Sequence, residues 1–91
     1  LPPAKITPRQ KAFVQWLATI PAEGLVVKNG KIKPLDERVA NLKAAIKKHI
    51  NEYKSVKTAA EKNGQMFAVK GLRRGLWLHL KALDIQSKKR K

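Results

Sequence analysis

The sequence predicts an all-α fold, with a short N-terminal helix, a long connection containing a tight hairpin turn, a long helical hairpin and a basic C-terminal tail. Two observations lead to this prediction. Apolar residues recur at helical spacing over most of the chain, and the strongest hairpin signal, Asn29-Gly30, stands between two short β-favouring runs. With 91 residues, the chain is long enough for one small domain, assigned to residues 1–86 and followed by the tail at 87–91.

The first helix is expected to follow an extended arm that contains two prolines. Thr7 can cap it, Pro8 suits the first helical position, and Gln10 completes a capping box. Pro21 limits the helix at its other end. The residues of the expected apolar face are spaced i, i+3, i+4 and i+7: Phe13, Trp16, Leu17 and Ile20.

The connection from Leu25 to Pro34 carries the Asn29-Gly30 turn signal. An isolated two-stranded hairpin is marginal in water. We therefore expect a tight turn with two or three ladder hydrogen bonds rather than a sheet.

A long helix is predicted from Asp36 to Asn63, with Gly64 as its left-handed C-cap. One face is apolar: Val39, Leu42, Ile46, Ile50 and Tyr53. Three lysines form a stripe about 100° or more around the helix: Lys43, Lys47 and Lys54. At about 28 residues the helix exceeds the globular mean of roughly 11 to 12, which predicts a hairpin arm projecting from a small body.

The last helix is predicted from about Gln65 to Leu83, with three sectors on a helical wheel. The first is apolar: Val69, Leu72, Leu76, Leu80 and Leu83. The second combines Phe67 and Leu78 with small residues, Ala68, Gly71, Gly75 and Ala82. These small residues predict close packing of a neighbouring backbone rather than approach of a phosphate. A basic strip lies between the two: Lys70, Arg74, Trp77 and Lys81, with Arg73 at its edge. Trp77 is expected either to stack on a base or ribose or to cover the lysine stems beside it.

The charge balance indicates the class of partner. Lys and Arg number 21 against six acidic residues, a formal net charge of +15, which favours a polyanion and nucleic acid first. No apolar run approaches the roughly 20 residues of a transmembrane helix, so we expect a soluble protein without a membrane partner. The chain begins with Leu1, which is consistent with a processed product or part of a longer precursor, and an organellar presequence is one way to lose its start.

Catalysis has few candidate groups. There is no cysteine, the acidic residues are scattered singly, and His49 and His79 lack an HxxxH or HExxH context. Both histidines are interpreted as packed or edge residues rather than metal ligands. We therefore expect a non-enzyme with no cofactor, no metal and no small-molecule substrate.

The segment from Val39 to Asp84 resembles the bacterial-type small-subunit ribosomal protein fifteen family, whose members are helical rRNA-binding proteins. The resemblance covers about half the chain. Its marks early in the long helix are Val39, Ala40, Leu42 and Ile46. Its marks late in the last helix are Gly71, Arg73, Arg74, Leu76, Leu80, Lys81 and Asp84, and the family's tyrosine near the end of that run corresponds to His79.

Several positions depart from the family. The family's His, Asp and Ser constellation between its long helices corresponds here to Glu52, Ala59 and Lys62, so those RNA contacts cannot be carried over. The family's Thr-Gly-Ser-Pro-Glu turn corresponds to residues 32–36, and its following glutamine to Arg38. Such drift is consistent with an organellar ribosome, and we expect a mitochondrial ribosome in preference to a bacterial cytoplasmic or plastid one.

The resulting expectation is a structural component of the small ribosomal subunit, in contact with rRNA and neighbouring ribosomal proteins. The tail from Ser87 is expected to be disordered alone and to thread along RNA when bound. The alternatives are a DNA-binding architectural protein of nucleoid or chromatin, and a peripheral membrane or protein-interaction module. The expected RNA-binding residues are Arg38, Lys43, Lys47, Lys54, Lys70, Arg73, Arg74, Trp77, His79, Lys81, Lys88, Lys89 and Arg90.

Overall fold

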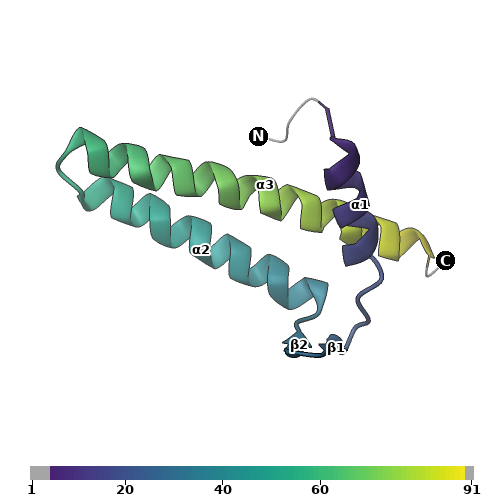
Figure 1. Ribbon diagram of the computed structural model, residues 1–91. Helices are drawn as coiled ribbons and strands as arrows, with labels where there is room; N and C mark the ends of the chain where they lie inside the picture. The colour runs from purple at the N-terminus through teal and green to yellow at the C-terminus, as the bar shows by residue number, and fades with distance from the viewer. Residues whose placement is uncertain (1–4, 90–91) are drawn as a thin grey trace.

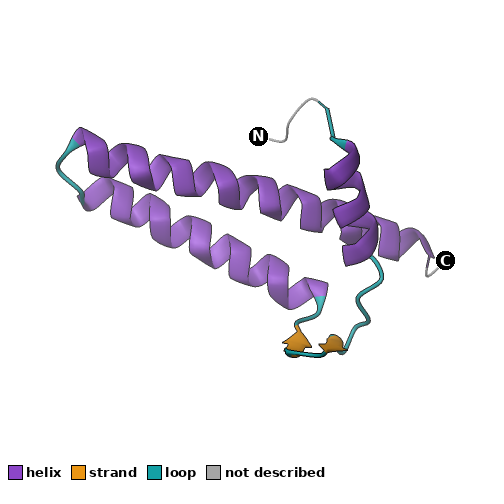
Figure 2. Ribbon diagram, viewed as in Figure 1, coloured by secondary structure: helices purple, strands orange, loops and turns teal. Residues whose placement is uncertain are grey.

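The computed structural model describes residues 5–89 and confirms the helical hairpin (Figures 1 and 2). Two long helices lie side by side, and a short helix crosses the second of them near its C-terminal end. A small two-stranded sheet lies in the connection between the short helix and the hairpin. In chain order the elements are α1 (Pro8–Leu17), β1 (Leu25–Val27), β2 (Gly30–Ile32), α2 (Leu35–Ser55) and α3 (Ala59–Lys89).

The predicted start of α1 is confirmed. The backbone N–H of Gln10 donates to Thr7 Oγ1 at 3.1 Å, and the Thr7 N–H donates to Gln10 Oε1 at 3.0 Å. This reciprocal capping box satisfies two backbone donors that a helix start otherwise leaves unpaired. Pro8 occupies the first turn, where it costs no hydrogen bond.

The predicted apolar face of the first helix is correct for Leu17 and Ile20, which are 0% and 1% exposed, and wrong for Phe13 and Trp16. Val14 and Leu17 are buried, whereas Phe13 and Trp16 are 37% and 40% exposed. Phe13 and Trp16 instead stack on each other at the edge of the core, with ring centroids 6.1 Å apart. Val14, which was not on the predicted face, takes part in the core cluster instead.

The hairpin in the connection exists, but its turn lies one residue earlier than predicted. Val27 pairs with Gly30 in antiparallel register, so Lys28 and Asn29 form the two-residue turn. Neither has a positive φ, so the turn is not the type I′ turn that an Asn-Gly signal favours. Gly30 is the residue with the unusual φ, at +145°.

The turn between the long helices was also predicted at the wrong place. α2 ends at Ser55 and α3 begins at Ala59, so Gly64 lies inside α3 rather than at a C-cap. Thr58 starts α3, because its Oγ1 accepts a hydrogen bond from the Glu61 N–H at 3.2 Å. The Thr58 hydroxyl in turn donates to the Glu61 carboxylate at 2.9 Å.

The core lies at one end of the molecule, where α1, the sheet and the first turn of α2 meet the C-terminal half of α3. Leu17 and Ala82 are completely buried there, and Ile20 is 1% exposed. Gln86 ties α1 to α3, because its Nε2 donates to the carbonyls of Ala18 at 3.0 Å and Ile20 at 2.7 Å. The buried members of this cluster are Val14, Leu17, Ala18, Ile20, Leu35, Leu78 and Ala82.

The rest of the hairpin forms the predicted arm. Away from the body, α2 and α3 pack only on each other, and the longest dimension of the molecule is 48 Å. Val39 and Val69 are the buried residues of this seam. Most of the other predicted seam residues are half-buried, as a two-helix layer requires: Leu42, Ile46, Ile50, Tyr53, Leu72 and Leu76. Leu80 was also predicted on this apolar face, but it is 43% exposed, which corrects that prediction.

The predicted close packing at the glycines of α3 is wrong. A Cβ atom built on Gly71 would meet no atom within 4 Å, and one on Gly75 would lie at an ordinary 3.8 Å from Leu42 Cδ2. The second sector of α3 is buried where α1 crosses it, at Leu78 and Ala82. Nearer the hairpin turn this sector faces solvent, and Phe67 there is 80% exposed.

The basic tail is shorter than predicted. α3 continues through Ser87 and Lys88 to Lys89, so these three residues are helical rather than disordered. Lys88 Nζ lies 3.1 Å from Asp84 Oδ2, an i,i+4 ion pair that supports the last turn. The remaining two residues of the predicted tail lie outside the described part of the chain.

Candidate nucleic-acid interface

The cations predicted on α2 lie along its outer surface. Lys43, Lys47 and Lys54 are exposed and lie within a narrow stripe, as their spacing predicts. Lys48, which was not among the predicted residues, lies beside them. A shallow groove runs along this side of α2, lined by Ala44, Lys47, Lys48, Asn51, Glu52 and Ser55.

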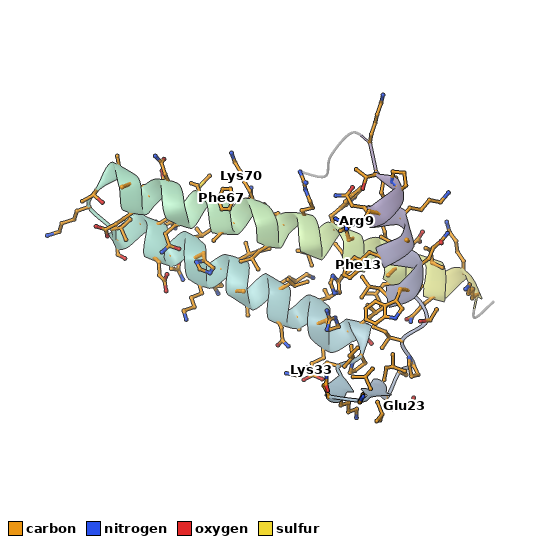
Figure 3. All side chains as sticks on the ribbon, in the orientation of Figure 1. Arg9, Phe13, Glu23, Lys33, Phe67 and Lys70 are labelled. Atoms are coloured by element: carbon orange, nitrogen blue, oxygen red, sulfur yellow. The ribbon has the colours of Figure 1, made fainter. Side chains whose placement is uncertain are left out.

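A second group of cations projects from the middle of α3. Lys70, Arg73 and Arg74 are exposed, and Lys70 points away from α2 (Figure 3). Lys70 and Arg74 form a ridge with a shallow hollow on each side. One hollow is lined by Met66, Val69, Lys70, Arg73 and Arg74. The other is lined by Phe67, Lys70, Gly71 and Arg74.

Carboxylates do not neutralise these cations. Within residues 5–89 the Lys–carboxylate ion pairs join Lys33 to Glu37 at 3.5 Å and Lys88 to Asp84 at 3.1 Å. Neither pair includes a cation from the outer surface of α2 or the middle of α3. These side chains therefore keep their charge available for an external anion.

His79 was predicted at the RNA surface, but it is only 5% exposed, which corrects that prediction. Its Nε2 accepts a hydrogen bond from Arg38 Nε at 3.0 Å, and its Nδ1 donates to the Gly75 carbonyl at 2.7 Å. The Phe13 ring packs edge-on against it at 6.0 Å. His79 thus holds the half-buried Arg38 in place rather than offering its own ring to a partner.

The environment of His79 favours the neutral imidazole. Burial lowers its pKa below the ordinary value of 6.5, and the nearby Arg38 charge lowers the pKa further, while the hydrogen bond to Gly75 acts in the opposite direction. Arg38 can only donate and a carbonyl can only accept. The proton of the neutral ring is therefore on Nδ1.

Of the two interpretations of Trp77, the geometry favours packing. Trp77 is half-buried and packs against the core cluster. Lys81 Nζ lies 5.1 Å from the centroid of its ring, a cation–π contact. The ring therefore supports the stem and charge of Lys81, which remains exposed.

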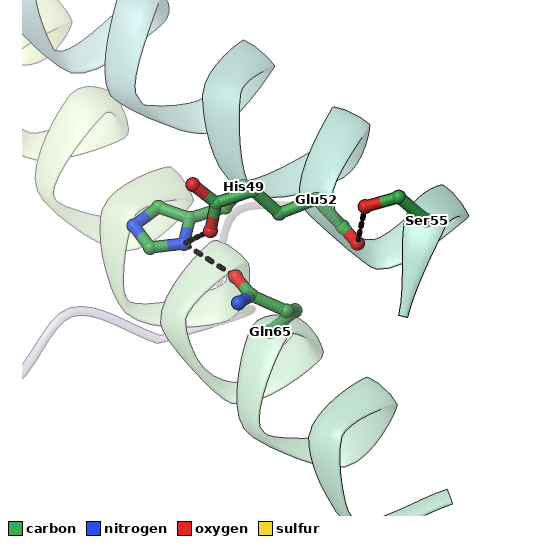
Figure 4. A network of polar contacts seen from close by, with 4 residues as sticks. All are labelled: His49, Glu52, Ser55 and Gln65. Carbon is green, nitrogen blue, oxygen red and sulfur yellow. Dashed lines mark hydrogen bonds and ion pairs between the residues drawn. The ribbon is translucent and has the colours of Figure 1, made fainter. Parts of the chain in front are cut away.

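At the tip of the hairpin, a polar network joins α2 to α3 (Figure 4). His49 Nδ1 donates to Gln65 Oε1 at 2.6 Å and lies 3.9 Å from Glu52 Oε2. Lys62 Nζ lies 5.8 Å from the ring centroid of Tyr53. Glu52 and Lys62 therefore both take part in contacts within the arm.

Two further predicted residues, Lys88 and Lys89, lie at the end of α3. Lys88 and Lys89 are exposed, although Lys88 is paired with Asp84. Arg90 lies outside the described residues. Lys88 and Lys89 are separated along α3 from the group at Lys70, so these two side chains do not form one continuous patch with it.

Sequence reasoning missed Phe67 as a surface residue. The helical wheel placed it correctly beside Gly71, but which part of that sector is covered depends on where α1 docks. No local signal in the sequence carries that information.

Other classes of site have little support in the described part of the chain. No group of three or more His, Cys, Asp or Glu side chains within residues 5–89 is placed to hold a metal ion. None of the described helices combines the length and the apolar character needed to cross a membrane. Comparisons with protein-family models, curated proteins and solved structures found no match.

Proposed function

We propose that this protein is a structural rRNA-binding component of the small ribosomal subunit. Its binding surfaces are the outer face of α2 and the middle of α3. The observation that carries the proposal is the set of exposed lysines and arginines on these two helices that, within residues 5–89, have no carboxylate partner. A net charge of +15 on 91 residues makes a polyanion the favoured ligand.

The proposed mechanism is neutralisation of closely spaced phosphates. Lys43, Lys47 and Lys54 act from α2, and Lys70 and Arg74 act from α3. Because the two helices are packed into one arm, RNA segments bound along them are held in a fixed relative orientation. A-form RNA has a deep major groove that side chains cannot read, so shape and backbone are recognised more than sequence.

The resemblance to the ribosomal protein fifteen family favours rRNA over DNA. A DNA-reading helix is expected to present Arg, Asn or Gln together to base edges. The exposed middle of α3 instead presents Lys70, Arg73 and Arg74, with the exposed Phe67 ring beside Lys70 and Arg74. The departures from the family at positions such as Glu52 and Lys62 lead us to propose a mitochondrial ribosome.

Salt-dependent binding to an rRNA fragment tests this proposal. Two variants neutralise the two surfaces: Lys43→Gln/Lys47→Gln/Lys54→Gln and Lys70→Gln/Arg73→Gln/Arg74→Gln. The control is Lys33→Gln, because the Lys33 charge is already engaged by Glu37. Circular dichroism of each variant verifies that the helices remain.

We expect each triple variant to weaken binding and to reduce the slope of log Kd against log salt by about one for each replaced cation that binds a phosphate in the wild type. Lys33→Gln is expected to leave the slope unchanged. Equal slopes for all the proteins, or tighter binding to duplex DNA than to rRNA, would favour the architectural DNA-binding alternative.

A further inference from the structure

The side chain of Phe67 is the most exposed of the large apolar side chains in the described residues. It is 80% exposed, although it lies in the middle of a well-formed helix. Phenylalanine is normally buried on folding, so a ring this open loses most of the stabilisation that burial would give it. Its neighbourhood indicates what could cover it.

The ring forms one wall of a shallow hollow on α3. Lys70 and Arg74 line its edge, and Gly71 forms its floor, one helical turn from Phe67. A Cβ atom on Gly71 would meet nothing within 4 Å, so the floor is bare backbone and the side of the ring above it is open. Figure 3 shows Phe67 and Lys70 together on α3, away from α1.

The charge around the hollow has one sign. Residues 62–83 of α3 contain five lysines and arginines and no aspartate or glutamate: Lys62, Lys70, Arg73, Arg74 and Lys81. A ligand that suits this site has a flat apolar face for the ring and negative charge on each side of it. An unpaired nucleotide has both, because its base has a π face and its backbone carries phosphates on either side.

We propose that Phe67 is a stacking platform for one unpaired RNA base. Lys70 and Arg74 contact the phosphates that flank the base, and Gly71 leaves room for the base edge. This inference rests on the proposed RNA-binding function and adds a preference for a bulge or loop over a continuous duplex. A paired base cannot stack on the ring without leaving its helix.

The experiment compares two RNA hairpins that differ by one unpaired 2-aminopurine bulge. The full chain is titrated with each hairpin at one fixed salt concentration, and both affinity and 2-aminopurine fluorescence are measured. The variants are Phe67→Ala, Phe67→Tyr and Gly71→Ala. The matched controls are Val26→Ala, which removes another apolar side chain that is 79% exposed, and Gly64→Ala, a second open glycine of α3.

We expect the wild-type chain to prefer the bulged hairpin and to change the fluorescence of the bulged base. Phe67→Ala is expected to weaken binding to the bulged hairpin about tenfold, or about 1.4 kcal/mol, with little effect on the paired hairpin. Phe67→Tyr keeps the preference, and Gly71→Ala reduces it. Val26→Ala and Gly64→Ala leave it unchanged.

Equal binding of both hairpins by the wild-type chain, with the expected salt dependence, would overturn the stacking proposal and leave the proposed function intact. A Phe67→Ala variant that retains the preference would also overturn it, because the preference would then not depend on the ring. Failure of the wild-type chain to bind either RNA would overturn both proposals.

Discussion

Arg38 on α2 donates a hydrogen bond from Nε to Nε2 of His79 on α3 at 3.0 Å. The two residues are 41 positions apart in the chain, and the bond joins the start of the arm to the helix on which α1 packs. It requires an unprotonated Nε2. The hydrogen bond therefore depends on pH.

Acid is expected to destabilise the fold through His79. Burial lowers the pKa of His79 in the folded protein below 6.5, so the unfolded chain takes up the proton at higher pH than the folded chain does. The free energy of unfolding should be at its full value above pH 6.5 and should fall as the pH drops from there to the lowered pKa. Urea denaturation between pH 7.5 and 5 measures this dependence. A His79→Gln variant with the same dependence as the wild type would contradict this prediction.

Gly71→Ala is expected to stabilise the protein by about 0.5–1 kcal/mol, because alanine restricts the unfolded chain and the new methyl group enters open space. Gly64→Ala should give a similar gain for the same reason. Urea denaturation of the two variants at pH 7.5 tests this. Reduced stability in Gly71→Ala would mean that another part of the protein packs on this face. If Gly71→Ala gains stability but binds bulged RNA more weakly, the loss of binding cannot come from a loss of stability, and it is explained by the methyl group occupying the space for the base edge.

Gly24→Ala is expected to destabilise the protein by about 1–3 kcal/mol, since Gly24 has φ +93°. The new Cβ would also lie 2.7 Å from the Ile32 carbonyl oxygen, which is backbone and cannot move aside easily. Gly30→Ala is the matched control, because Gly30 also has a positive φ but would meet no atom within 4 Å. The thermal midpoint should fall further for Gly24→Ala. Equal decreases would show that the contact with Ile32 has no effect.

Gln86→Met is expected to loosen α1. Methionine keeps the shape of the side chain but removes the donor that serves the carbonyls of Ala18 and Ile20, at an expected cost of about 1–3 kcal/mol. Hydrogen exchange of the α1 amides should accelerate more than that of α2. Uniform acceleration in both helices would indicate global destabilisation instead.

Local patterns predicted local structure well. The Thr7 capping box and the apolar face of α2 depend on residues close together in the chain, and both were found. The same reasoning could have placed the start of α3, because Thr58-Ala59-Ala60-Glu61 has the sequence pattern of a capping box, and Thr58 Oγ1 does accept a hydrogen bond from the Glu61 N–H. Gly64 was given more weight than this signal, although one glycine inside a helix costs only about 1 kcal/mol.

Predictions that depended on long-range packing were less accurate. α1 has ten residues and crosses only the C-terminal half of α3, so it covers Leu78 and leaves Phe67 and Gly71 open. His79 is buried because α1 and Arg38 close over it. The basic strip itself could be predicted, because a two-helix arm buries only the facing sides of its helices, and lysines and arginines on the other sides are exposed to solvent.

The most direct test of the proposed ribosomal function is to purify the tagged full chain from its source cells in low salt, follow it through a sucrose gradient and sequence the bound nucleic acid. We predict that the chain migrates with the small ribosomal subunit and that its rRNA is enriched, mitochondrial rRNA in particular. Recovery of genomic DNA in light fractions, with no enrichment of rRNA, would contradict the ribosomal assignment and favour the architectural DNA-binding alternative.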